Sequence, residues 1–170
     1  MGRFKAALAA GVVVLVFGPV ATAQAQPWTT FSAALSAEAE IPECLASEES
    51  GGHGRAIVQI DEETGEIRYR VVATHVPGTI AGSPGSHIHV GPATGTGGIV
   101  QALTLTGREN GLIAAGTATN PTLAAAILAN PAGYYVNVHS TTCPSGVMRG
   151  QLAGGGAADA AAADAPGRRR

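Results

Sequence analysis

The sequence contains few basic residues outside its two ends. Between residues 27 and 153 it has five Arg, no Lys and ten Asp plus Glu, so this segment has a formal net charge of −5. Proteins that bind nucleic acid usually carry clustered Lys and Arg side chains that neutralise phosphates. The lack of such a cluster argues against nucleic acid as a partner. The acidic residues that gather between 38 and 49 predict a solvated loop or sheet edge.

The sequence also lacks the motifs of several large enzyme classes. It contains no strand–helix repeat, GxGxxG, P-loop or GxSxG motif, and no pair of carboxylates at an obvious catalytic spacing. Ser86 and Ser140 each directly adjoin a histidine, which is not how a nucleophile and its base usually face one another. We therefore predict no catalytic residues and a non-catalytic binding or structural role.

Residues 1–25 have the composition of a secretory signal peptide. A basic start precedes an apolar run, residues 6–17, that is too short to span a bilayer comfortably. Small residues then mark two cleavage positions, after Ala23 and after Ala25. We predict cleavage after Ala25, with Ala23 as the alternative. The protein is then secreted or held in the cell envelope, has no transmembrane segment, and meets an extracellular or envelope partner that the sequence does not name.

The C-terminal segment, residues 154–170, is mostly Ala and Gly and ends in three Arg. It has almost nothing to bury, so we predict a disordered tail. The segment between the two ends, residues 27–153, is long enough for one domain with its own core.

The sequence has only two cysteines, Cys44 and Cys143. An exported protein can keep a disulfide, and we predict one between them. It would close a loop of about 100 residues, worth about 4–5 kcal/mol in the chain-entropy model. Two free thiols, or a pair of soft metal ligands, are the alternatives.

Short segments of alternating polar and apolar residues, separated by Gly, Pro and Asn, fill residues 27–153. In the clearest one, Ile67, Tyr69 and Val71 face one side of a half-buried strand. Asn120 and Pro121 are typical of a helix start, and they precede one short apolar helix. We predict an all-β fold, an antiparallel Greek-key β-sandwich of about eight strands. The strands are expected at residues 28–37, 54–61, 66–71, 86–90, 99–106, 111–119, 134–140 and 146–152, and a hairpin loop at 61–65.

Three of the five histidines fall on predicted strands in a pattern that suits a metal site. In the strand at 86–90, Ile88 takes the core side and His87 and His89 point outward together. The same alternation turns His139 outward. If these strands are neighbours, three imidazoles converge as ligands for copper, zinc, iron or nickel. His75 is a possible fourth ligand, and ordinary surface histidines are the alternative.

Two polar residues share the predicted outer face with these histidines. Asn137, two residues before His139, either orients an imidazole from behind or hydrogen-bonds a neighbouring strand. Arg149 is a second supporting residue, for which we expect a structural salt bridge to a glutamate.

Five motifs in order resemble the chordin-type domain, the CHRD family. They are FSAALSAEAEIPE, TGEIRYRVV, SHIHVGPA, YYVNVHS and GVMRGQL, and together they run from about Phe31 to Leu152. The resemblance implies an exported β-sandwich module. The chain departs from the family pattern at Ala37, where Gly is usual, and in its two added cysteines, Cys44 and Cys143.

A fainter likeness exists to Cu/Zn superoxide dismutase, which implies copper as the cofactor. His87 and His89 match its H-x-H strand, His139 matches a later V-x-H strand, and Arg149 matches an arginine near a closing glycine. That enzyme takes a further copper ligand from a long loop after the H-x-H strand. Residues 91–98 contain no His, Asp or Cys, so His75 is the only source of a fourth ligand. Copper or other transition-metal binding is thus the alternative to a purely structural role.

Overall fold

The computed structural model describes residues 28–82 and 85–154. The predicted signal peptide, residues 1–25, and all but the first residue of the predicted tail lie outside these ranges. The strands are β1 (Trp28–Ser36), β2 (His53–Asp61), β3 (Glu66–Thr74), β4 (Ser86–Val90), β5 (Ile99–Ala102), β6 (Gly111–Thr119), β7 (Tyr134–Val138), β8 (Met148–Gln151) and β9 (Ala153–Gly154). The helices are α1 (Leu45–Ser50), α2 (Pro121–Ala129) and the 3₁₀ turn η1 (Pro131–Gly133).

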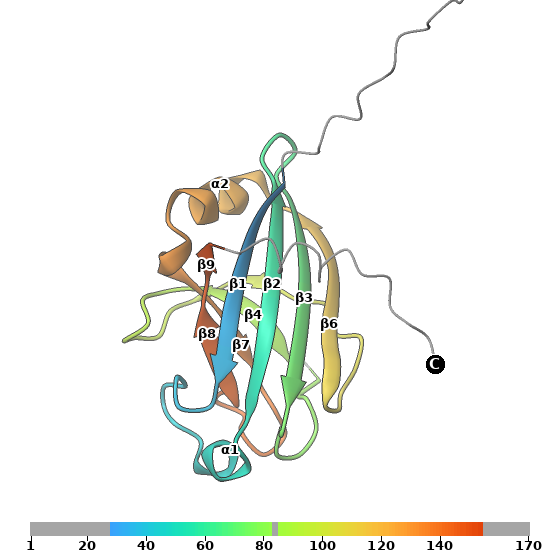
Figure 1. Cartoon of the computed structure of the whole chain (residues 1–170), viewed down its shortest axis with the longest axis vertical. Helices are drawn as coiled ribbons and strands as arrows, with labels where there is room; N and C mark the ends of the chain where they lie inside the picture. The colour runs from blue at the N-terminus through green and yellow to red at the C-terminus, as the bar shows by residue number, and fades with distance from the viewer. Residues whose placement is uncertain (1–27, 83–84, 155–170) are drawn as a thin grey trace, which may run out of the picture.

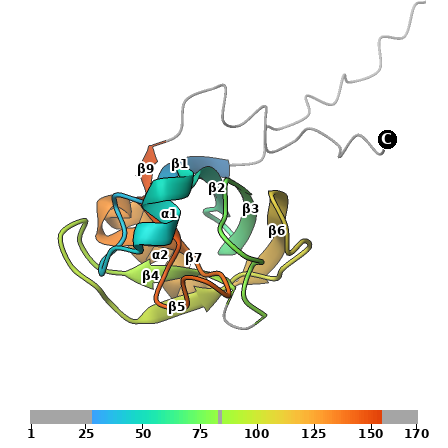
Figure 2. The same ribbon diagram turned by 90° about the horizontal axis from the view of Figure 1, so that it is seen from below.

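The strands form one antiparallel sheet that curls into two layers. Its order is β5-β4-β7-β8-β1-β2-β3-β6, and β9 pairs with β1. The strands β1, β2, β3 and β6 make one layer, and β4, β5, β7 and β8 lie behind it (Figures 1 and 2). The layers join where Ser36 of β1 pairs with Arg149 of β8, and a bridge between Leu105 and Ala114 links their other side. The predicted all-β sandwich is therefore confirmed.

The core lies between the layers and follows the predicted alternation. Ile67, Tyr69 and Val71 of β3 are all buried. From the opposite layer, Ile88 of β4 and Val136 of β7 are fully buried within the same cluster. Each such side chain contributes about 1.5–3 kcal/mol by leaving water. These contacts fix which face of β4 and β7 points inward, and therefore which residues occupy the outer face.

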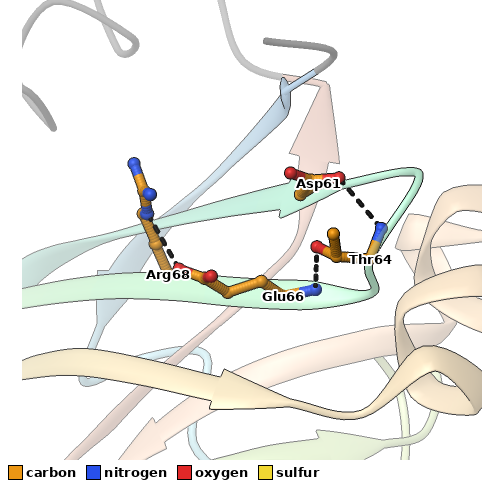
Figure 3. Close-up of polar contacts among 4 residues, drawn as sticks. All are labelled: Asp61, Thr64, Glu66 and Arg68. Atoms are coloured by element: carbon orange, nitrogen blue, oxygen red, sulfur yellow. Dashed lines mark hydrogen bonds and ion pairs between the residues drawn. The ribbon is translucent and has the colours of Figure 1, made fainter.

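The hairpin between β2 and β3 forms at the predicted position (Figure 3). The Asp61 carboxylate accepts the backbone N–H of Thr64 at 3.0 Å, and Gly65 takes the left-handed conformation with φ 71°. That hydrogen bond is the main cause of the lowered pKa of Asp61. The Thr64 hydroxyl accepts the N–H of Glu66, whose carboxylate pairs with Arg68 at 3.1 Å. The hydrogen bonds of the Asp61 and Thr64 side chains and the left-handed conformation of Gly65 therefore stabilise the same turn.

Helix α2 begins as predicted, because the Asn120 side chain accepts the N–H of Leu123 at 3.1 Å. Helix α1 was not predicted, and the prediction of a solvated loop over residues 38–49 is wrong in two places. Ser47 of α1 is buried and donates its hydroxyl hydrogen to the carbonyl of Val147 at 2.5 Å. The Glu40 side chain, before the helix, is buried as well.

The disulfide between Cys44 and Cys143 is confirmed, with its Cα atoms 6.0 Å apart. It joins the residue before α1 to the loop between β7 and β8.

Some predicted strands are longer than the observed ones. The strand expected at 99–106 ends at Ala102, and the one expected at 134–140 ends at Val138. Among the described residues, no helix is long and apolar enough to cross a membrane.

Candidate metal centre

The candidate centre lies on the outer face of β4, β7 and β8. Strands β4 and β7 are direct neighbours, as the metal hypothesis required. The register places His87 opposite Asn137, and Asn137 opposite Arg149 of β8. One step along, His89 lies opposite Tyr135. Because side chains alternate along a strand, all five of these residues project to the face turned away from the core.

His87 and His89 point away from the core as predicted, but the prediction that they lie on the surface is wrong, because this outer face is covered. His87 retains 1% of its accessible surface and His89 8%, and Asn137 and Arg149 are buried as well. The loop at residues 91–98, between β4 and β5, lies against this face and forms hydrogen bonds with His89, Tyr135 and Arg149. The face is therefore a second, polar interior beside the apolar core.

Arg149 holds this covering loop in place. Its guanidinium donates to three loop carbonyl oxygens, those of Pro92 at 3.2 Å, Ala93 at 2.8 Å and Gly95 at 2.9 Å. We expected Arg149 to form a salt bridge to a glutamate. Its guanidinium N–H groups instead donate to backbone carbonyls of the loop. A planar guanidinium suits this role because it presents several donors in fixed directions.

Tyr135 is a member of the site that the sequence did not reveal. Its hydroxyl oxygen accepts the N–H of Gly97 at 3.2 Å, which adds another tie to the loop. Its ring stacks on the His89 imidazole, with centroids 4.7 Å apart and planes 8° apart. The Arg149 guanidinium carbon lies 4.2 Å from the centre of the same ring. The stack fixes the plane of the His89 ring and lowers its freedom to rotate.

The three predicted ligands converge. One ligand nitrogen from each of His87, His89 and His139 lies within 4.8 Å of the others. The shortest separation that the structure gives is 3.2 Å, between Nδ1 of His87 and Nε2 of His89. The rings of His87 and His139 have centroids 4.9 Å apart. Two strands and the loop after β7 therefore supply one compact cluster of imidazoles.

Backbone carbonyls orient two of these rings. Nδ1 of His89 lies 2.8 Å from the oxygen of Gly97, and Nδ1 of His139 lies 2.9 Å from that of Pro144. A carbonyl only accepts, so each Nδ1 carries the hydrogen and each Nε2 keeps its lone pair. Nε2 of His139 is buried without a hydrogen-bond partner among residues 28–82 and 85–154. A histidine that binds a metal through one ring nitrogen usually donates from the other to a carbonyl or carboxylate, as His89 and His139 do here.

Burial also favours the uncharged form of His89. The pKa of His89 is lowered, first because the ring is desolvated, and then because His139 and Arg149 add positive charge nearby. The carbonyl of Gly97 acts in the opposite direction and only partly offsets these effects. A lowered pKa means that the His89 lone pair stays free of protons at neutral pH, as a ligand requires.

Glu40 is the second residue that the sequence did not reveal. Burial raises the pKa of its carboxyl from 4.5 to about 7, although the Ile41 N–H, Arg149 and Asn137 each lower it. Its Oε1 accepts the N–H of Ile41 at 3.0 Å and lies 3.5 Å from Nδ2 of Asn137. A Cβ on Gly146 would lie within 2.7 Å of all three carboxyl atoms, so only glycine leaves room for this group.

The remaining two histidines lie outside the cluster. His75 follows β3 in a left-handed conformation, φ 57°, and its ring stacks on His53 at 5.2 Å between centroids. Within the described ranges, the group of converging ligand atoms consists of His87, His89 and His139. The structure therefore places His75, which the sequence named as a possible fourth ligand, apart from the other three histidines.

Comparison with known protein families gives one match. The family model of the CHRD domain matches residues 31–152. The chain belongs to the CHRD-domain family. No curated protein and no solved structure matches the chain, so the likeness to superoxide dismutase is not confirmed. The matched range of the CHRD domain includes every residue of the cluster, together with Glu40, Arg149 and the disulfide.

Proposed function

We propose that this CHRD domain is an exported, non-catalytic module that binds one transition-metal ion, copper or zinc, through His87, His89 and His139. The observation that carries the proposal is the convergence of three imidazole nitrogens within 4.8 Å of one another. Buried polar atoms normally have partners, and Nε2 of His139 is buried without a hydrogen-bond partner among the described residues, which supports a role in binding a ligand.

The spacing of one pair of nitrogens fits a single ion. Two imidazole nitrogens about 2.0–2.1 Å from one metal, at angles of about 90–109°, are separated by roughly 2.9–3.4 Å. The 3.2 Å between His87 Nδ1 and His89 Nε2 lies in that range. Nitrogens on opposite sides of an ion are at most about 4.2 Å apart, so a pair separated by 4.8 Å has to close by at least about 0.6 Å, and by about 1.4 Å at a tetrahedral angle, when the ion binds.

The tautomers define how each histidine would bind. His89 and His139 hold their Nδ1 hydrogens on carbonyls, so each would bind through Nε2. His87 faces the cluster with Nδ1, and because His89 Nε2 only accepts, this Nδ1 donates the hydrogen of their 3.2 Å hydrogen bond. In this proposal that hydrogen moves to Nε2 of His87 when the ion binds, and Nδ1 becomes the ligand atom. Imidazole ligands suit copper and zinc, and both cysteines are already used in the disulfide.

Two features support a holding role outside the cytoplasm over a catalytic one. The Arg149 guanidinium donates to three loop carbonyls, so its donors are used in holding the loop. The disulfide is compatible with an oxidising compartment, as the predicted signal peptide also requires.

A titration of the purified protein with Cu²⁺ and Zn²⁺ tests the proposal. We expect one ion per chain, and at least a 100-fold loss of affinity in His139→Ala, because a ligand is removed. His75→Asn is the matched control, since asparagine tolerates the left-handed conformation of His75 and the cluster stays intact. Weak binding that is equal in all three proteins would overturn the proposal.

Acidification provides a second readout of the same site. Protons and metal compete for the imidazole lone pairs, so the ion should dissociate as the pH falls below about 6.5, the ordinary histidine pKa. Retention of the ion at about pH 4 would exclude histidine as the ligand set.

A further inference from the structure

We infer that Glu40 supplies the negative charge that balances a divalent ion at the three histidines, without being a ligand itself, and that it gives up a proton when the ion binds. This inference rests on the proposed function, because it concerns the same site. It assigns a role to a residue that the histidine pattern does not include.

The first argument is the environment of the carboxyl group. Glu40 is 2% exposed, and its Oε2 is buried with no hydrogen-bond partner in the described part of the chain. Gly146, with φ 146°, leaves the space that the carboxyl occupies. Burying a carboxyl is costly unless it is fully hydrogen-bonded or paired with a charge. Here the absence of a side chain at Gly146 leaves room for this carboxyl.

The second argument is the path from this carboxyl to the histidines. Asn137 Nδ2 lies 3.5 Å from Glu40 Oε1, and the strand register puts Asn137 directly beside His87. Asn137 Oδ1 is also buried without a partner in the described structure. Glu40 is not among the residues whose ligand atoms converge. It therefore lies one side chain behind the cluster, where it acts through charge and not through coordination.

The third argument is the balance of charge. The imidazoles are neutral when they bind a metal, and Arg149 already places one positive charge in this buried region. A divalent ion would add two more. The positive charge of Arg149 lowers the pKa of the buried Glu40 carboxyl, although burial raises it more. Burial raises its pKa to about 7, so it is largely protonated at mildly acidic pH in the metal-free protein. A nearby cation favours the ionised form, so the proton is released as the ion binds.

Proton release on Zn²⁺ binding tests the inference. Calorimetry in buffers of different ionisation enthalpy counts the protons that leave for each ion bound. At about pH 6 the wild-type protein should release about one proton more than Glu40→Gln, and at about pH 8 the two should release equal numbers. The Zn²⁺ affinity of Glu40→Gln at about pH 8 should fall about ten-fold, since one favourable charge is lost.

Glu38→Gln is the matched control, because Glu38 is an exposed carboxylate in the same segment. It should behave as the wild type does. An infrared difference spectrum of the wild-type protein gives a readout that needs no variant: the band of a protonated carboxyl should disappear when Zn²⁺ is added at about pH 6.

The outcomes separate the two proposals. If the wild-type protein does not bind Zn²⁺ or Cu²⁺, both proposals fail. If His139→Ala abolishes binding while Glu40→Gln matches the wild type in proton count and affinity, the metal site stands and the role of Glu40 is refuted. A loss in Glu40→Gln that Glu38→Gln does not share supports both.

Discussion

Breaking the disulfide between Cys44 and Cys143 should lower the free energy of unfolding by about 4–5 kcal/mol. The two residues are separated by 99 positions, so the bond closes most of the domain into one loop. In the chain-entropy model a loop of about 100 residues restricts the unfolded chain by about 4.7 kcal/mol at 25 °C. The Cα atoms are 6.0 Å apart, a normal distance for this bond, so the backbone does not oppose it.

The disulfide also links two segments that border the candidate centre. Cys44 follows the segment that carries Glu40, and Cys143 precedes Pro144, whose carbonyl orients His139. Reduction should therefore weaken metal binding more than the loss of stability alone explains, because the segments that carry Glu40 and Pro144 can then move apart.

Urea unfolding of the oxidised and reduced protein measures the stability effect. The variant Cys44→Ala/Cys143→Ala is the control, since reductant should not change its midpoint. The reduced protein should also show a larger dependence on urea, because its unfolded chain is less compact. A loss below about 1.5 kcal/mol would refute the reasoning, and would mean that the unfolded chain is already constrained without the bond.

Two further predictions concern buried charges. In Glu40→Gln, the metal-free protein should gain stability over the wild type as the pH rises from 4.5 to about 7, because only the unfolded chain ionises readily in that window. The gain should reach about 2 kcal/mol after screening by water. Urea midpoints measured across this range check it, with Glu38→Gln expected to be flat. Arg149→Met should cost about 2–4 kcal/mol and speed amide exchange in the loop at residues 91–98, because three loop carbonyls lose their donor. Arg68→Met removes an arginine that is 47% exposed, and a cost under about 1 kcal/mol is expected there. Equal costs for the two arginines would contradict the role of Arg149.

Much of the fold could be predicted because local signals agreed with the final packing. The alternation through Ile67 and Tyr69 gave the buried face of β3, and the turn residues gave the hairpin at Gly65. Helix α1 could not be predicted, because a six-residue helix has little stability of its own. It depends on tertiary contacts, such as the hydrogen bond from Ser47 to the Val147 carbonyl, which lies 100 positions away.

The candidate centre was partly predictable for a similar reason. Alternation put His87 and His89 on one face of their strand, and the V-x-H pattern added His139. Their burial was not predictable, because the loop at residues 91–98 contacts them through backbone carbonyls. Every residue has such a carbonyl, so the sequence does not show which ones accept a hydrogen bond. Glu40 was missed because it stands among exposed acidic residues. The only signal for it was its place in the EIPE segment of the family motif.

X-ray absorption by the Zn²⁺-loaded protein would test the central claim most directly. The account predicts a first shell that includes three imidazole nitrogens at about 2.0–2.1 Å. It also predicts two imidazoles, or no stable complex, in His139→Ala, while His75→Asn keeps three. A first shell made mainly of oxygen, or an imidazole count that His139→Ala leaves unchanged, would contradict the claim that His87, His89 and His139 form a metal site.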